Sequence, residues 1–305
     1  MPLPDDYLVY PKRRLGPDHE RYDASPVRDR APLVLPDGAK VALWVNVLLE
    51  FFPLNPSGKP FKAPGAMQTP YPDLRHYTTR DYGNRVGVYR ILKVLDRLGI
   101  PATFWAQGAV AERYPTLIRD IQAAGHEIGA HGWDTDTIHH TAMDEGAERK
   151  AIADTLATLK DVTGTAPQGW LSPARAEGFA TPDRLKEGGV EWFADWAHDE
   201  LPTAFRTTAG DLTAMPLSDM LDDWQILVTY RRPEEEWVAQ VADSADWLVD
   251  EADRFGGRVL SLTLRPHISG QAYRIRPLAD SLEQALARPG VRAMTGGAIL
   301  DAWRK

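Results

Sequence analysis

The sequence predicts an α/β protein in which mostly parallel strands and helices form an irregular (β/α) barrel, preceded by an extended N-terminal arm. Short apolar runs alternate with segments of helical periodicity along most of the 305 residues. Such alternation is typical of parallel βαβ units, and the length suits one barrel domain. No glycine-rich fingerprint for a nucleotide phosphate follows any predicted strand, which disfavours an open doubly wound sheet.

The chain divides into an arm and one barrel domain. Residues 1–38 are rich in Pro, Arg and Asp and have little periodicity, so we expect an extended arm packed on the barrel. Residues 39–305 are expected to form the catalytic barrel. Its first strand, 40–49, is almost continuously apolar, as in a strand buried on both faces. The long loop that follows, 53–77, has the length of a lid or binding loop.

The remaining elements follow from hydrophobic periodicity and from glycines at helix ends. The sequence predicts helices at 82–98, 115–124, 144–162, from 181, at 234–254 and at 278–287. It predicts strands at 101–106, before the loop at 131, and at 169–172, 190–196, 225–229, 258–264 and 291–294.

Composition excludes several classes of function. The formal net charge of -8 argues against a nucleic-acid partner, and no apolar run approaches the roughly 18 to 20 residues of a membrane span. The N-terminus lacks the basic and apolar regions of a secretory signal, so we expect a cytoplasmic protein. Because the chain has 0 cysteines, any metal must bind to His, Asp or Glu. The expected partner is a small-molecule substrate.

Histidines and carboxylates gather where predicted strands end. Four of the eight histidines lie in residues 126–140. In a barrel the chemistry sits at the carboxyl ends of the strands. His131, Asp195 and His267 stand out because each follows an apolar run directly. The same edge is expected to carry further polar side chains, namely Asn46, Glu50, Asp134, Ser172 and Arg175.

Four segments carry a resemblance to a known family. Residues 125–133 (GHEIGAHGW) resemble a signature segment of the polysaccharide deacetylase superfamily. Residues 82–90 (YGNRVGVYR), 169–173 (GWLSP) and 265–270 (RPHISG) are more similar to its branch of allantoinases and cyclic imide hydrolases. The resemblance implies a distorted (β/α) barrel that hydrolyses carbon–nitrogen bonds other than peptide bonds. Related barrels are often oligomeric, so a homo-oligomer is also expected by analogy.

The sequence departs from the sugar deacetylases of this family at two points. Those enzymes have an Asp-Asp pair after the first strand and a second metal-binding histidine four residues after the first. Here Thr135 stands four residues after His131, and Glu50 is the only carboxylate near the end of the first strand.

Two mechanisms are compatible with these departures. In the favoured one the site needs no metal. Glu50 or Asp195 is the general base, and His131 or His267 protonates the leaving nitrogen. Arg175 or Asn46 stabilises the oxyanion. In the alternative, a zinc ion is held by His131, by His139 or His140 of the lengthened loop, and by Asp134 or Glu50.

The favoured substrate is a small cyclic amide, imide or ureide. The loop at 53–77 is expected to close over a small molecule and to exclude a polymer. Aromatic residues at the strand ends would form flat walls for a planar ring. The expected substrate-binding residues are Asn46, Trp133, Asp134, Ser172 and Trp196. Two other functions remain open: a metal-dependent N-deacetylase of an N-acylated small molecule or sugar, and a catalytically inactive ligand-binding relative.

Overall fold

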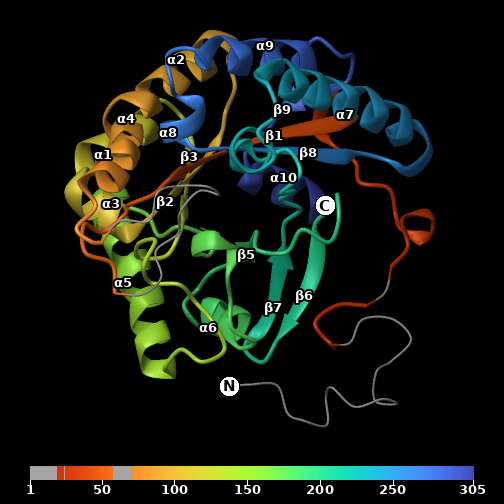
Figure 1. Ribbon diagram of the computed structural model, residues 1–305. Helices are drawn as coiled ribbons and strands as arrows, with labels where there is room; N and C mark the ends of the chain where they lie inside the picture. Colours follow the sequence, from red (N-terminus) through yellow and green to blue (C-terminus); the bar gives the residue numbers. More distant parts are fainter. Residues whose placement is uncertain (1–18, 24, 58–69) are drawn as a thin grey trace.

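The protein folds around one curled sheet of nine strands. The structure, a computed structural model, describes residues 19–23, 25–57 and 70–305 (Figure 1). The strand order is β6-β7-β5-β4-β3-β2-β1-β8, and β9 adds to β1. Every pairing is parallel except the β6-β7 hairpin. The strands are β1 (Val41–Leu49), β2 (Thr103–Ala106), β3 (Glu127–Ala130), β4 (Gly169–Trp170), β5 (Trp192–Phe193), β6 (Thr203–Thr207), β7 (Gly210–Ala214), β8 (Arg258–Leu264) and β9 (Val291–Ala293).

The predicted fold class is confirmed, and the barrel is a half-barrel. In the described part of the chain, the end strands β6 and β8 do not pair with each other. A loop closes this seam instead, because the Val259 N–H donates to the carbonyl oxygen of Glu200 at 3.2 Å.

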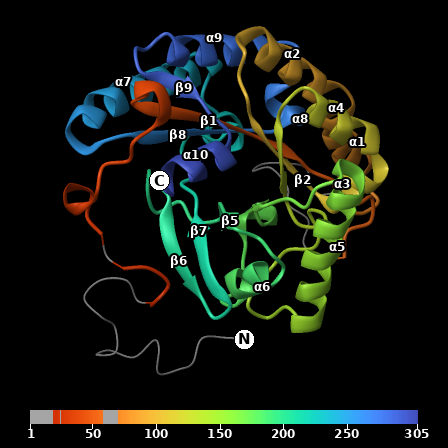
Figure 2. The ribbon, with the colours of Figure 1, turned by 180° about the vertical axis from the view of Figure 1, so that it is seen from behind.

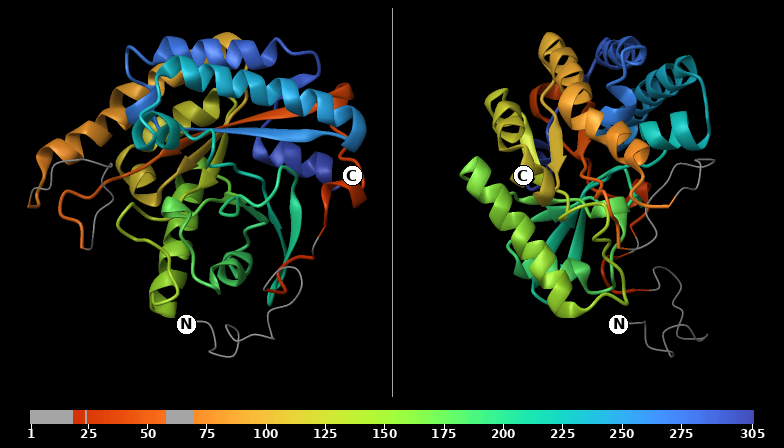
Figure 3. Two further views of the ribbon diagram at one scale, coloured as in Figure 1. Left: turned by 45° about the vertical axis from the view of Figure 1, so that its right-hand side comes forward. Right: turned by 60° about the vertical axis from the view of Figure 1, so that its left-hand side comes forward.

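Most of the long helices lie along the outer, convex side of the sheet, whereas α10 lies on the inner side (Figures 1 and 2). Helices α7 and α9 run side by side, and α7 contacts β8 (Figure 3). The α-helices are α1 (Leu74–Tyr82), α2 (Val88–Leu98), α3 (Gly108–Arg113), α4 (Pro115–Ala123), α5 (Glu145–Thr163), α6 (Thr181–Glu187), α7 (Glu234–Phe255), α8 (Pro266–Ser269), α9 (Ile275–Leu286) and α10 (Gly296–Trp303). Shorter helical segments are η2 (Val27–Asp29), η3 (Pro36–Gly38), η4 (Gly83–Gly87), η5 (Pro173–Arg175) and η6 (Trp224–Thr229). The helical prediction for 82–98 therefore holds across η4 and α2.

One predicted strand is wrong. Residues 225–229 lie in the helical segment η6. A short apolar run fits a buried strand and a buried helical turn equally well, so periodicity alone does not distinguish them. The β6-β7 hairpin was not predicted, because its strands expose about half of their residues and lack a continuous apolar run.

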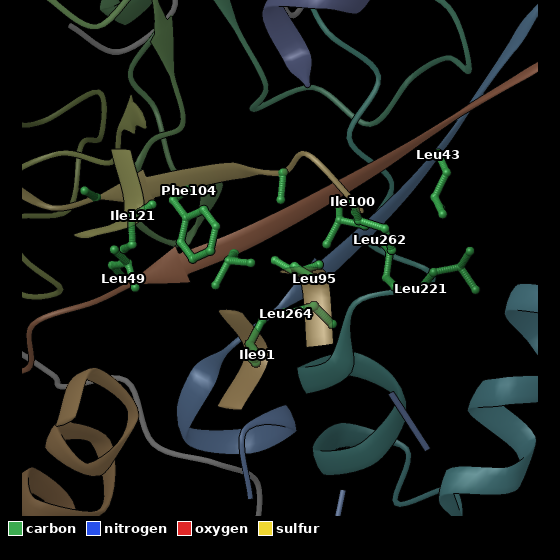
Figure 4. Packing of buried hydrophobic residues seen from close by; sticks show 14 of the residues in the cluster. Leu43, Leu49, Ile91, Leu95, Ile100, Phe104, Ile121, Leu221, Leu262 and Leu264 are labelled. Atoms are coloured by element: carbon green, nitrogen blue, oxygen red, sulfur yellow. The ribbon is translucent and has the colours of Figure 1, made fainter. Parts of the chain in front are cut away.

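The side chains of β1 alternate between two separate hydrophobic cores. Its odd-numbered residues face the helices, where Leu43 packs with residues such as Leu95 and Leu262 (Figure 4). Its even-numbered residues face the concave side, where Trp44 packs edge-to-face against Trp105 and Trp192. Strand side chains alternate with a period of two. The same concave face therefore continues through Asn46 and Leu48 to Glu50.

Helix α10 completes the concave core at the amino-terminal end of the strands. Its Ile299 and Leu300 are buried with Trp44 and Trp192. A Cβ at Gly296 would lie 2.5 Å from the Trp192 ring, so this close approach requires glycine. No helix in the described residues combines the length and the apolar character needed to cross a membrane.

The described part of the predicted arm is bound to the domain at several points. Arg21 donates to both carboxylate oxygens of Asp183, at 2.8 and 2.7 Å. Arg30 forms an ion pair with Asp199 at 2.6 Å. Leu33 pairs with the chain at Gly256. Residues 1–18 and 24 of the predicted arm, and 58–69 of the predicted lid, lie outside the described residues.

Candidate active site

A cavity of about 210 Å³ lies at the carboxyl ends of β1, β3 and β8. It has an apolar side and a charged side, and the charged side chains come from strand ends that are far apart in the sequence. Its lining comprises Leu48, Glu50, Phe52, His131, Thr135, Ile138, Leu171, Ala174, Arg175, Asp219, Asp222, Trp224, Gln225, Thr263 and Arg265. Three of the predicted catalytic residues are therefore brought together, namely Glu50, His131 and Arg175.

Glu50 and His131 face each other in this cavity. Oε1 of Glu50 lies 3.9 Å from Nε2 of His131, and Oε2 lies 3.7 Å from Nε of Arg265. Burial by itself raises the pKa of Glu50. The interaction with His131 and the charge of Arg265 outweigh burial and bring the pKa to about 2. Glu50 is therefore ionised at neutral pH.

The ring of His131 is oriented by a backbone contact. Its Nδ1 lies 2.8 Å from the carbonyl oxygen of Leu171. A carbonyl oxygen only accepts, so Nδ1 carries the hydrogen and donates it. In the neutral ring, Nε2 is then an unprotonated acceptor. This nitrogen is buried, has no hydrogen-bond partner and points toward Glu50. An unpaired buried polar atom in a cavity is a feature of a functional site.

Arg265, the first residue after β8, joins the site to a buried carboxylate pair. Its guanidinium contacts Asp222 and lies 3.2 Å from Asp223. Asp223 also accepts hydrogen bonds from the Arg265 backbone N–H and the Ser269 hydroxyl, both at 2.6 Å. Burial raises the pKa of Asp223 to about 7, although Arg265 opposes the shift.

The sequence analysis did not assign Arg265, Asp222 or Asp223 to the site. One observation could have identified Arg265: like His131, it follows an apolar strand directly. Asp222 and Asp223 have no such sequence feature. They precede a segment that was predicted as a strand, so they were not expected at the carboxyl end of any strand.

Arg175 reaches the cavity from a strained turn. Both Ala174 and Arg175 have left-handed backbone angles, with φ of 56° and 52°. Such conformations cost about 1 to 3 kcal/mol in non-glycine residues and concentrate at functional sites. The guanidinium donates to the carbonyl oxygens of Leu217 and Ser218, at 2.9 and 3.0 Å. The cation is thus held in one position.

His267 lies beside the cavity but is not part of its lining. Its ring packs edge-to-face against Phe52 and Trp224, and its Nε2 is buried without a hydrogen-bond partner. Burial lowers the pKa of His267 to about 3, against the opposing charge of Glu50. The ring is therefore neutral at neutral pH.

Asp195, Ser172 and Asn46 do not line the cavity, which corrects the roles predicted for them. Asp195 accepts from both the backbone N–H and the hydroxyl of Ser172, each at 2.7 Å. Both side chains are buried outside the cavity. Asn46 lies on the concave face of β1, where its side-chain oxygen Oδ1 accepts a hydrogen bond from Trp105 Nε1 at 2.8 Å. Its amide donates to the backbone of Trp44.

Three residues predicted to bind substrate also lie elsewhere. Trp133 packs closely against the start of α3, within 2.6 Å of where a Cβ of Gly108 would lie. Asp134 accepts from the backbone N–H groups of residues 136 and 137 and so stabilises its own loop. Trp196 packs against Tyr22 and contacts the carboxylate of Glu177. The aromatic walls of the cavity are Phe52 and Trp224 instead.

The alternative zinc ligands are not assembled. His139 is fully buried, and its Nδ1 lies 3.1 Å from the Glu148 carboxylate. Oδ1 of Asp134 is engaged by backbone N–H groups. Across residues 19–23, 25–57 and 70–305, no three His, Asp or Glu side chains are grouped so that they could hold a metal ion. The predicted set of His131, His139 or His140, and Asp134 or Glu50 does not fit a zinc ion.

The carboxyl ends of the strands, where this charged cavity lies, are where (β/α)-barrel enzymes place their active sites. Comparison with known proteins shows which families the chain resembles. The model of the polysaccharide deacetylase family matches residues 70–192. Peptidoglycan deacetylase of Helicobacter pylori is 23% identical over 73% of this chain and 86% of its own. A putative polysaccharide deacetylase of Schizosaccharomyces pombe is 24% identical over 73% of this chain and 74% of its own.

Solved structures agree with this assignment. PuuE allantoinase superposes with a TM-score of 0.82 at 25% identity, over 90% of this chain and 94% of its own. A probable polysaccharide deacetylase of Pseudomonas aeruginosa has the same TM-score at 24% identity, over 90% of this chain and 95% of its own. The chain is therefore similar to members of the polysaccharide deacetylase superfamily and, in structure, to an allantoinase.

Proposed function

We propose that the protein hydrolyses the carbon–nitrogen bond of a small cyclic amide, imide or ureide without a metal ion. The observation that carries the proposal is the pair formed by ionised Glu50 and the unpaired Nε2 of His131, 3.9 Å apart in a cavity with two guanidinium groups. The volume of about 210 Å³ is below the range of about 300 to 1,000 Å³ usual for drug-sized ligands. A small ring fits this space better than a sugar chain.

The arrangement supports a proton transfer through His131. A water molecule between Glu50 and His131 would donate one hydrogen bond to each, and its oxygen would attack the ring carbonyl carbon. Nε2 of His131 takes the proton released by the water, and Glu50 stabilises the imidazolium that forms. His131 then gives this proton to the leaving nitrogen as the carbon–nitrogen bond breaks. The product is one opened chain with a carboxylic acid at one end, and the released nitrogen is an amine, an amide or a urea for a cyclic amide, imide or ureide respectively.

Arg175 is the candidate for stabilising the oxyanion. Its side chain is half-buried and lines the cavity, and its hydrogen bonds to two carbonyl oxygens hold the guanidinium in place. A preorganised donor of this kind contributes about 10²- to 10³-fold to the rate. Arg265 is less suited to this role because it is already paired with carboxylates.

A metal-dependent deacetylase is the second candidate, favoured by the family match to residues 70–192. It requires three grouped metal ligands, which the described residues do not provide.

A substrate screen separates the candidates. The purified protein would be incubated with hydantoin, succinimide, allantoin and N-acetylglucosamine oligomers, each with and without EDTA, alongside the Glu50→Gln variant. We expect ring opening of at least one cyclic amide that resists EDTA and is lost in the variant. Deacetylation that requires a metal would favour the second candidate. No turnover of any compound would favour an inactive ligand-binding relative.

A further inference from the structure

We propose that Asp195 is a positioning residue that acts on His131 through a single peptide unit. The inference rests on the proposed function, because it assigns to His131 the proton transfer described above. Asp195 does not reach the cavity, so its effect on the reaction would be indirect.

The peptide bond between Leu171 and Ser172 lies between the two side chains. Its N–H donates to Oδ1 of Asp195 at 2.7 Å. Its carbonyl oxygen accepts from Nδ1 of His131 at 2.8 Å. The N–H and the carbonyl belong to the same planar amide, so the carboxylate and the imidazole interact with opposite ends of one dipole.

The hydrogen bonds around Ser172 indicate that Asp195 is ionised. Trp170 Nε1 lies 2.9 Å from the Ser172 hydroxyl oxygen, and an indole N–H can only donate. The hydroxyl therefore accepts from Trp170 and donates its own hydrogen to Oδ2 of Asp195, 2.7 Å away. Both oxygens of Asp195 thus accept hydrogen bonds.

The neighbouring Glu177 carries the proton of this carboxyl pair. Burial, and then the charge of Asp195, raise the pKa of Glu177 to about 8. Burial also raises the pKa of Asp195, but two donors bind its oxygens, so the negative charge of the pair is placed on Asp195 and the proton on Glu177. The two side chains are similar in chemistry and burial but differ in charge, so they form a matched pair for an experiment.

The charge on Asp195 strengthens the hydrogen bond from Nδ1 of His131 to the Leu171 carbonyl oxygen. Hydrogen bonds in a chain polarise one another, so a carboxylate bound to the N–H makes the carbonyl of the same amide a better acceptor. A better acceptor at Nδ1 keeps the hydrogen on that nitrogen and leaves Nε2 free on the cavity side. It also stabilises the imidazolium formed during proton transfer, together with Glu50 on the other side.

The first test uses the wild-type protein and needs no substrate. Nitrogen-15 NMR of histidine-labelled protein at about pH 8 would give the tautomer of His131, with its resonance assigned from a His131→Asn sample. We expect a hydrogen on Nδ1 and none on Nε2. A hydrogen on Nε2 instead would overturn the proposal, whatever the protein hydrolyses.

The second test compares Asp195→Asn with Glu177→Gln. The asparagine keeps an oxygen that can accept from the Ser172 N–H but removes the charge. We expect a share of the Nε2–H tautomer to appear and kcat for hydantoin to fall about tenfold, the difference between a charge-assisted and a neutral hydrogen bond, with KM little changed. Glu177→Gln replaces one neutral group with another and should leave the tautomer and kcat as in the wild type.

Two results would overturn the role of Asp195. One is a wild-type tautomer and a wild-type kcat in Asp195→Asn. The other is an equal loss in both variants, which would indicate a general effect of disturbing this buried cluster. If no protein turns over hydantoin, the proposed function fails for this probe, while the NMR comparison still decides whether Asp195 positions His131.

Discussion

Replacing His267 with leucine should make the protein less sensitive to acid. The wild-type imidazole is buried between Phe52 and Trp224, and burial lowers its pKa from the ordinary value of about 6.5 to about 3. Leucine fits an apolar site and cannot titrate. The variant therefore separates the stability effect of this one group from the rest of the acid response.

The sign of the effect follows from proton linkage. Below the unfolded-state pKa of about 6.5 the unfolded chain binds a proton at His267, while the folded chain binds none until the pH approaches about 3. Stability is thus full above about pH 6.5 and is lost as the pH falls toward 3. With these two pKa values, the loss from this group between about pH 8 and pH 5 is about 2 kcal/mol.

Urea unfolding between about pH 5 and pH 8 measures this directly. The measured quantity is the free energy of unfolding of the wild type minus that of His267→Leu. This difference should decrease by about 2 kcal/mol as the pH is lowered from about 8 to about 5. The subtraction cancels other groups, including the buried His126 and His139. His140→Leu, at an exposed histidine, is the matched control for the loss of an imidazole. A difference that stays constant with pH, or one that is identical in both variants, would refute burial as the cause.

Three further substitutions and one metal test follow from the site. Glu50→Gln should lower kcat for a cyclic amide about 10²- to 10⁴-fold with KM changed less than about tenfold, in steady-state kinetics; a wild-type kcat would exclude Glu50 from the reaction. Arg265→Met should lower the free energy of unfolding by about 3 to 5 kcal/mol, because it leaves buried carboxylates unpaired; a stable variant would contradict this. Asn46→Ala should cost about 1 to 3 kcal/mol by leaving Trp105 Nε1 without an acceptor, again by urea unfolding. Dialysis against EDTA should leave cyclic-amide turnover intact, and loss restored by zinc would disprove the proposed mechanism.

The position of Glu50 on the concave face of the sheet could be predicted from the sequence. Strand β1 is nine residues long, so its alternation is well determined, and Glu50 has the same parity as Trp44, Asn46 and Leu48. His131 likewise has the parity of Glu127 and Gly129 in β3. The expectation that strand ends meet at one edge of a parallel sheet was enough to bring these two residues together.

The position of Asp195 was not predictable in the same way. Strands β4 and β5 have two residues each, too few to determine which face a following residue occupies. A shift of one residue moves a side chain to the opposite face of a sheet. Trp192 and Ala194 face the concave side, so Asp195 falls on the other face with Phe193. Its place directly after an apolar run was therefore correct, but its direction was not.

The Arg265 cluster depends on a contact that no local pattern contains. Asp222 and Asp223 lie about forty residues before Arg265 and reach it only because η6 folds as a helical turn beside the end of β8. Predicting that segment as a strand removed both carboxylates from the strand-end edge. An error in one element thus led to the omission of Asp222 and Asp223.

The Arg265 cluster also explains how the cavity keeps Glu50 ionised. A buried carboxylate normally gains a proton unless a positive charge compensates it. Arg265 lies 3.7 Å from Glu50 and is held there by Asp222 and by the backbone contact with Asp223. Both oxygens of Asp223 accept hydrogen bonds, Oδ1 from the Arg265 guanidinium and Oδ2 from the Arg265 backbone N–H and the Ser269 hydroxyl. The buried pair behind Arg265 therefore fixes the position of the cation that stabilises the charge of Glu50.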